Sequence, residues 1–221
     1  MNPRIQVEHT VTEMVTGVDL VRAQLLIAAG KPLSDPEIGI TCQKDIQPRG
    51  YAIQCRVTTE DPANNFAPDT GKITAYRSSG GFGIRLDGGN GYSGAEISPY
   101  YDSLLVKVTC CDNTFAGACH KALRALSETR VRGVKTNISF ITNILTNETF
   151  RKGQCYTKFI DETPELFDIS ESRNRGNKLL EYIGNIVVND PKAGAKMYEP
   201  SRVPEVEGDI SAGYKQYLDQ H

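Results

Sequence analysis

Hydrophobic and polar residues alternate along the first nine positions of the chain. Successive side chains of a β-strand point to opposite faces, so this pattern of period two predicts an opening strand. Its polar face would carry Asn2, Arg4, Gln6 and Glu8. An arginine fork suits a small oxyanion and a carboxylate can act as a base, so this face is either a site or a solvated surface.

A helix signal and a second strand signal follow the opening segment. Asp19 can cap a helix, and Gly30 would end it. Residues 50–59 alternate again and predict a strand in which Arg56 lies on the polar face. We therefore expect two arginines, Arg4 and Arg56, on polar strand faces.

The rest of the ordered pattern predicts a sheet and two helices. Turn signals recur through residues 60–109, which are expected to be rich in strands, with a short buried strand at 104–108. Capping residues predict one helix over about 114–128 and another over about 137–145. A sheet whose helices lie in a separate stretch of sequence predicts an α+β fold.

The composition narrows the classes of function. The chain has 221 residues and a net charge of −2, which gives no reason to expect nucleic acid or a membrane surface as a partner. No apolar run approaches the roughly 18 residues of a membrane-spanning helix. The six cysteines show no zinc-binding spacing, so we expect reduced and mostly buried thiols in a cytoplasmic or mitochondrial matrix protein.

A glycine-rich stretch, Gly80-Gly81-Phe82-Gly83, invites comparison with a phosphate-binding loop. It lacks the Gly-Lys-Ser/Thr ending of such loops and lies among strand signals rather than before a helix. A hairpin or a β-bulge is the favoured interpretation.

Several motifs of the chain resemble those of biotin carboxylases, the ATP-grasp enzymes that carboxylate biotin with bicarbonate. The opening residues 2–13, NPRIQVEHTVTE, closely resemble the signature of that family. Spacing as well as residue type agrees at further motifs, namely MVTGVDL at 14–20, QCRV at 54–57, EDP at 60–62, PDTGKI at 68–73, GGFG at 80–83, YYDS at 100–103 and GVKTN at 133–137. The resemblance covers roughly residues 1–162.

This resemblance implies roles for individual residues near the start of the chain. Arg4, Gln6 and the backbone of Val7 match bicarbonate-binding positions, and Glu8 matches the base that deprotonates bicarbonate. Asn2 matches a position beside the ATP-bound magnesium.

Other matched positions lie later in the chain. Arg56 matches the arginine that stabilises the biotin anion. Phe82 and Arg85 match the surface through which biotin carboxylases dimerise. Asp102 would lie close to the biotin entrance and the dimer contact, or would be a purely structural aspartate.

The resemblance also implies cofactors and a domain plan. Biotin, ATP and Mg²⁺ (or Mn²⁺) would be the cofactors. Residues 1–36 would end an ATP-grasp domain, 37–162 would form the mixed sheet and helix domain that follows it, and 163–221 would form a linker. The glutamate that binds magnesium directly before Met1 in the family, and the whole nucleotide-binding half, are missing, so we expect the chain to be inactive alone.

The tail indicates which branch of the family is involved. Residues 174–189, NRGNKLLEYIGNIVVN, and 214–219, YKQYLD, are similar to the segment that leads toward the tetramerisation and carboxyltransferase regions in the pyruvate carboxylase family. The expected partners are bicarbonate, biotin on a carrier domain, the upstream nucleotide-binding half and a second copy within a tetramer. The alternatives are the biotin carboxylase part of an acyl-CoA carboxylase and a non-catalytic oligomerisation module.

Overall fold

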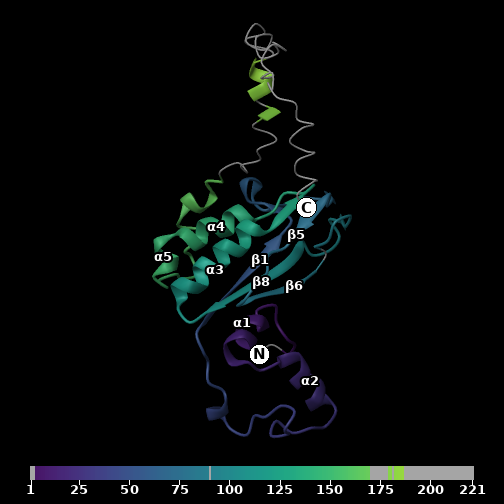
Figure 1. The fold of residues 1–221 in the computed structure, drawn as a ribbon, viewed down its shortest axis with the longest axis vertical. Helices are drawn as coiled ribbons and strands as arrows, with labels where there is room; N and C mark the ends of the chain where they lie inside the picture. The colour runs from purple at the N-terminus through teal and green to yellow at the C-terminus, as the bar shows by residue number, and fades with distance from the viewer. Residues whose placement is uncertain (1–2, 90, 170–178, 181, 187–221) are drawn as a thin grey trace, which may run out of the picture. The chain divides into compact units, whose positions relative to one another are not determined.

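The computed structural model of the chain describes residues 3–89, 91–169, 179–180 and 182–186 (Figure 1). It divides into two compact units, Met1–Ser170 and Glu171–His221. Within the second unit, the described residues 179–180 and 182–186 are helical. The predicted linker at 163–221 therefore lies largely outside the described residues.

A three-stranded antiparallel sheet forms the centre of the first unit. Its strands are β1 (Tyr51–Thr58), β8 (Leu104–Asp112) and β6 (Ile84–Gly88), in the order β1-β8-β6. Three short pairs accompany it: β2 (Glu60–Asp61) with β3 (Ala67–Pro68), β4 (Gly71–Lys72) with β7 (Glu96–Ile97), and β5 (Ala75–Arg77) with β9 (Arg130–Arg132). The predicted strand at 50–59 is confirmed, and the one at 104–108 continues to residue 112.

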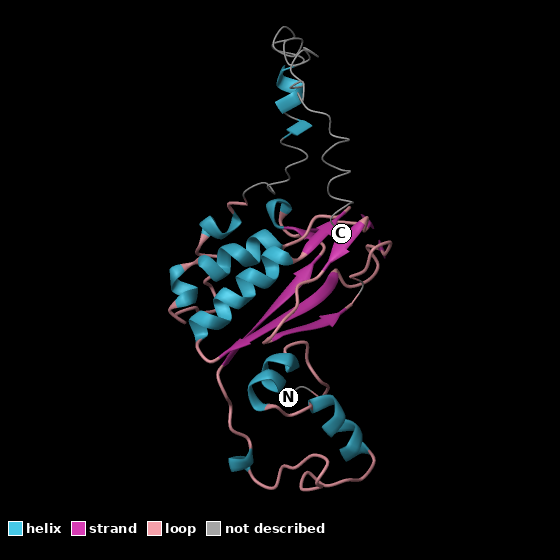
Figure 2. Cartoon of the chain, viewed as in Figure 1, coloured by secondary structure: helices cyan, strands magenta, loops and turns pink. Residues whose placement is uncertain are grey.

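Helices cover the apolar face of this sheet (Figure 2). They are α3 (Phe115–Glu128), α4 (Ile138–Thr146) and the short α5 (Glu148–Arg151), so both predicted helices are confirmed. The fully buried Val57, Val108 and Leu126 are typical of the core between the layers. Each such side chain stabilises the fold by about 1.5–3 kcal/mol. The antiparallel sheet comes mostly before the helices that cover it, so the architecture is α+β, as expected.

Two further helices precede the sheet in the chain, α1 (His9–Thr16) and α2 (Leu20–Ala28). The side chain of Asp19 accepts a hydrogen bond from the Arg22 amide, which confirms the predicted cap of α2. α1 lies against the polar face of the sheet, where the hydroxyls of Thr10 and Thr109 are 2.7 Å apart and both residues are fully buried. The sheet is thus covered by helices on its two faces.

The predicted opening strand is wrong for the residues that the structure describes. Residues 3–8 form a loop and a turn, in which the His9 amide donates to the Gln6 carbonyl at 3.1 Å and the Val11 amide to the Glu8 carbonyl at 3.0 Å. A strand requires a neighbouring strand for its backbone groups, and none of the described strands pairs with this segment. The backbone groups at its end begin α1 instead.

The glycine-rich stretch forms a tight turn into β6. Gly83 has a left-handed φ of 76°, and a Cβ there would lie 2.5 Å from the Cys111 carbonyl oxygen, so only glycine fits. A strand rather than a helix follows, which argues against a phosphate-binding loop. The short helices η1 (Gln43–Asp45), η2 (Pro62–Asn64) and η3 (Pro164–Phe167) complete the described elements.

All six cysteines are free, but only half of them are buried, fewer than the sequence predicted. Cys55, Cys110 and Cys119 are buried, whereas Cys42 and Cys155 are exposed. Burial raises the pKa of the Cys55 thiol to about 12 and that of Cys110 to about 11, so both stay protonated at neutral pH. Among the described residues, no helix has the length and apolar character needed to cross a membrane.

Candidate functional site

An ion pair joins the loop before α1 to the polar face of β1. The Glu8 carboxylate lies 3.1 Å from the Arg56 guanidinium, although the two residues are 48 positions apart in the sequence. Their side chains are 57% and 52% exposed, so both charged groups remain within reach of a solute. The structure thus brings together a candidate base and a candidate anion-stabilising group.

Gln54 ties this pair to the rest of the loop. Its amide nitrogen donates to the Val7 carbonyl at 2.8 Å and also to the Thr10 hydroxyl, and its amide oxygen accepts from Arg56 Nε at 3.3 Å. Because Thr10 in turn bonds to Thr109, a continuous chain of hydrogen bonds runs from the buried Thr109 of β8 to the ion pair.

A second polar cluster lies beside the site, between α1 and the sheet. His9 contacts the Glu13 carboxylate through Nδ1 at 3.0 Å and the Lys107 ammonium through Nε2 at 3.4 Å. Lys107 is the partner of Arg56 in the pairing of β1 with β8. A lysine opposite the arginine adds positive charge to this part of the sheet face, which favours an anion there.

Glu13 is the buried centre of that cluster, with 6% of its side chain exposed. Arg85 donates to it at 2.6 Å, and the Leu20 amide donates at 2.8 Å. Burial by itself raises the pKa of the Glu13 carboxyl, but the hydrogen bonds from Arg85, Leu20 and His9 outweigh burial and hold that pKa below 4.5. Glu13 is therefore a charged, structural carboxylate at neutral pH.

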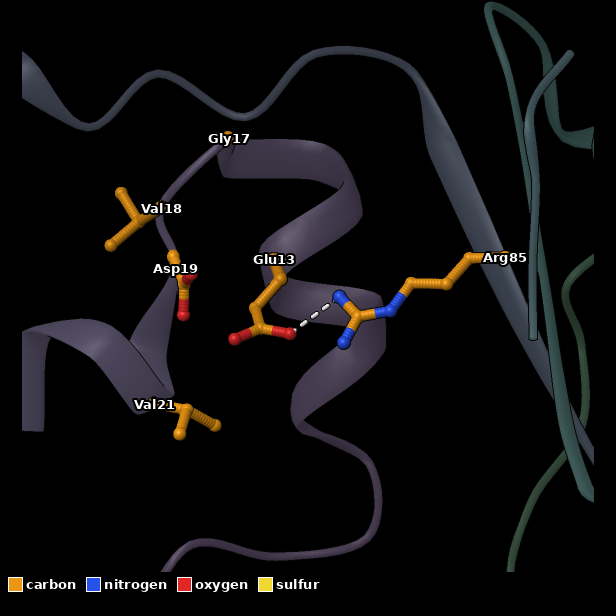
Figure 3. A pocket seen from close by; sticks show the side chains of 6 residues that line it. All are labelled: Glu13, Gly17, Val18, Asp19, Val21 and Arg85. Carbon is orange, nitrogen blue, oxygen red and sulfur yellow. Dashed lines mark hydrogen bonds and ion pairs between the residues drawn. The ribbon is translucent and has the colours of Figure 1, made fainter. Parts of the chain in front are cut away.

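A cavity of about 400 Å³ lies next to this carboxylate (Figure 3). Glu13 and Arg85 point toward one another at its wall, and the other lining residues are Gly17, Val18, Asp19 and Val21. Arg85 also makes two bonds to Asp87, at 2.8 Å and 3.0 Å. Since two carboxylates neutralise this arginine, it is poorly suited to bind a further anion.

The remaining predicted bicarbonate residues lie on the same loop as Glu8. Arg4 is exposed and donates to the Ile5 carbonyl at 3.0 Å, and Gln6 is half-buried. Within the described part of the chain, neither side chain hydrogen-bonds to Glu8 or Arg56. Arg4, Gln6 and Val7 as bicarbonate ligands therefore stay a prediction.

The predicted metal-binding residue, Asn2, lies outside the described residues. In the part of the chain that the structure describes, no group of three or more His, Cys, Asp or Glu side chains is placed to hold a metal ion.

The predicted dimer residues lie in the turn before β6, on β6 itself and in the segment before β8. The Phe82 side chain is 97% exposed, and the Lys121 ammonium lies 5.6 Å from the centre of its ring. Arg85 is bonded within the chain, as described above. Asp102 is exposed, and its carboxylate accepts from the Leu104 amide at 3.0 Å.

Sequence reasoning missed the residues that support the site. Gln54 shares the polar face of β1 with Arg56, and this spacing of two was the available signal. Asn137 was expected only to cap α4, but its side chain donates to the Arg56 carbonyl at 3.0 Å and accepts from the Thr58 amide at 2.9 Å. No local pattern identifies this contact, because 81 positions separate Asn137 from Arg56.

Two family models match the chain. Residues 54–162 match the biotin carboxylase C-terminal domain, and residues 1–36 match the ATP binding domain of the carbamoyl-phosphate synthase L chain. The chain is 56% identical over 227 aligned residues to the pyruvate carboxylase of Staphylococcus aureus, and the alignment covers 100% of the chain and 20% of that protein. The chain thus spans about a fifth of the length of this curated relative.

Solved structures agree with these matches. The complete multifunctional pyruvate carboxylase from Rhizobium etli superposes with a TM-score of 0.78 at 54% identity, over 85% of this chain and 18% of that one. The biotin carboxylase domain dimer of the Hydrogenobacter thermophilus 2-oxoglutarate carboxylase, in complex with MgADP, ADP and bicarbonate, gives 0.73 at 44% identity, over 77% of this chain and 36% of that one.

Proposed function

The chain belongs to the biotin-dependent carboxylases, and we propose that it supplies the bicarbonate- and biotin-binding residues of a longer pyruvate carboxylase. The reaction would be the ATP-dependent carboxylation of biotin, the first half of the conversion of pyruvate to oxaloacetate. The observation that carries the proposal is the ion pair between Glu8 and Arg56. It places a base beside a fixed cation, and both charged groups are accessible to a substrate.

Glu8 acts as the general base in this proposal. A carboxylate can take the proton of bicarbonate only if it lies within hydrogen-bond reach, and Glu8 is half-exposed at the end of a loop. Its position at the start of α1 is fixed by the turn that the Val11 amide closes with the Glu8 carbonyl at 3.0 Å. Positioned proton transfer of this kind contributes about 10²–10⁴-fold to a rate.

Arg56 stabilises the negative charge that develops on the biotin ureido group. Its backbone is held on both sides by β8 and by Asn137, and its guanidinium is held by Glu8 and Gln54. A charge fixed before the reaction costs no reorganisation during it, which is the physical basis of this kind of catalysis. Arg4, Gln6 and the Val7 backbone bind bicarbonate on the same loop, where an arginine fork suits the anion.

The cofactors of the proposed reaction are biotin, ATP and magnesium or manganese. When bound, ATP would supply the free energy that activates bicarbonate, and biotin would supply the ureido nitrogen that accepts the carboxyl group. Asn2, which lies outside the described residues, would contribute to magnesium binding. Residues 1–36 end the ATP-grasp domain, 37–162 form the biotin carboxylase C-terminal domain, and 163–221 lead toward the tetramerisation and carboxyltransferase regions.

The partners follow from the same proposal. They are bicarbonate, biotin on a carrier domain, the nucleotide-binding half, and a second copy that contacts the chain around Phe82, Arg85 and Asp102. The compartment would be the bacterial cytoplasm or the mitochondrial matrix. Several pyruvate carboxylases among the relatives align with the whole chain, tail included, which supports this proposal over an acyl-CoA carboxylase.

Complementation tests this proposal. The chain would be assayed for ATP cleavage that depends on bicarbonate and biotin, alone and mixed with the part of the Staphylococcus aureus relative that precedes the matched region. We expect no cleavage by the chain alone and cleavage in the mixture. ATP cleavage by the chain alone would place the nucleotide site within it. No cleavage by a correctly folded mixture would favour a non-catalytic oligomerisation module.

A further inference from the structure

We propose that Gln54 is a positioning residue that holds Arg56 in its working orientation while Glu8 is engaged with bicarbonate. This inference rests on the proposed function. Gln54 contacts both halves of the site, because its amide nitrogen bonds to the Val7 carbonyl at 2.8 Å and its amide oxygen bonds to Arg56 Nε at 3.3 Å.

The geometry at Arg56 explains why a second holding group is needed. Glu8 holds one edge of the guanidinium through Nη2 at 3.1 Å, and Gln54 holds Nε. A base that receives a proton from bicarbonate weakens its own bond to the arginine at that moment. The neutral amide of Gln54 does not titrate, so its bond to Arg56 Nε persists. This bond keeps the planar guanidinium of Arg56 in its orientation.

The surroundings of Gln54 make it suited to this role. It is half-buried, and its nitrogen also donates to the hydroxyl of Thr10, which is fully buried against Thr109. A side chain fixed at both ends loses little further freedom when the site fills. Arg56, by contrast, is half-exposed and ends in a long flexible side chain whose orientation must be imposed from outside.

Two substitutions separate positioning of Arg56 from anchoring of the loop. Gln54→Met removes all three side-chain hydrogen bonds at similar size. Gln54→Glu keeps an acceptor for Arg56 Nε but cannot donate to the Val7 carbonyl or to the Thr10 hydroxyl. If Gln54 acts through Arg56, the glutamate variant recovers part of the kcat that the methionine variant loses. If it only anchors the loop, the glutamate variant is at least as impaired.

The experiment uses the full-length Staphylococcus aureus relative with these 221 residues in place of its own segment. The kcat and the KM for free biotin are measured for biotin-dependent ATP cleavage, and thermal melting checks the fold. We expect Gln54→Met to lower kcat by about ten- to a hundredfold. Gln47→Met is the matched control, because Gln47 is exposed and its amide bonds only to the Lys44 carbonyl among the contacts described.

A double variant completes the test. In an Arg56→Ala background, Gln54→Met should lower kcat by less than about twofold more, because residues that act through one another are not additive. Additive losses, or an unchanged kcat in Gln54→Met, would overturn the inference. The proposed function fails separately, since it requires Glu8→Gln to lower the rate whatever happens at Gln54.

Discussion

At the scale of single residues, the structure separates two carboxylates that lie five positions apart. Glu8 is half-exposed and pairs with Arg56, whereas Glu13 is 6% exposed and pairs with Arg85 and His9. An accessible carboxylate can accept a proton from a substrate, and a buried one with three partners cannot readily do so. The environment thus supports the proposed chemical role of Glu8 and gives Glu13 a structural one.

Glu13→Gln tests the structural role through its pH dependence. The pKa of Glu13 is lowered in the folded state, so its stabilisation is present above its unfolded pKa of about 4.5 and is lost as pH falls through the folded pKa. We expect the variant to be less stable than the wild type at pH 7 by roughly 1–3 kcal/mol. The difference should shrink as pH falls below the unfolded pKa, as measured by urea unfolding at pH 7 and at a series of lower pH values.

A matched control shares the substitution but not the burial. Glu128 is 43% exposed and pairs with Arg124 across one helical turn, so Glu128→Gln should change the free energy of unfolding little at either pH. A loss of stability in Glu13→Gln that stays constant with pH would show that the charge of Glu13 contributes nothing.

At the scale of elements, one side chain at the start of α4 connects that helix to the backbone of β1. Asn137 begins α4, yet its side chain bonds to the Arg56 carbonyl and the Thr58 amide instead of capping the helix. The Asn137 side-chain amide thereby hydrogen-bonds to backbone groups near the end of β1, as a neighbouring strand would. The strand that carries Arg56 is fixed on one side by β8 and on the other by this contact.

Removing this contact should destabilise the fold. Asn137→Ala leaves the Arg56 carbonyl and the Thr58 amide without these bonds in a largely buried place, which costs about 1–3 kcal/mol. Urea unfolding of the chain measures this loss. Asn113→Ala is the control, because Asn113 is exposed in the turn before α3, and equal stability of the two variants would contradict the role given to Asn137.

The sequence predicted those elements whose signals are local. The cap at Asp19, the alternation around Arg56 and the capping signal before α3 each depend on neighbouring residues, and each was confirmed. The opening strand was wrong because alternation alone does not provide a pairing partner, and Gln6 and Glu8 accept the turn bonds that start α1. The contact of Asn137 with β1 could not be predicted, since it depends on the packing of distant segments.

At the scale of the whole molecule, the first unit presents a large aromatic side chain to solvent next to the sheet edge. Phe82 is 97% exposed in the turn that leads into the edge strand β6. Exposed aromatics of this size often mark a surface that a partner covers. The proposed contact between two copies of the chain lies here.

A charge at this position should prevent association. We expect the chain to form dimers, and Phe82→Glu to be monomeric with unchanged thermal melting, because the side chain has little packing to lose. Light scattering during gel filtration measures the mass. Leu33→Glu is a matched control on an exposed leucine in the loop after α2, and identical masses for wild type and Phe82→Glu would exclude this surface as the contact.

The central claim is that Glu8 removes the proton from bicarbonate, and its most direct test is the transfer of radiolabelled bicarbonate to free biotin. The test uses the full-length relative carrying this segment, with Glu37→Gln as a control at an exposed carboxylate paired with Lys31. We predict that Glu8→Gln lowers the rate of label transfer by about 10²–10⁴-fold while the control transfers label normally. A Glu8→Gln variant that transfers label at the wild-type rate would contradict the account.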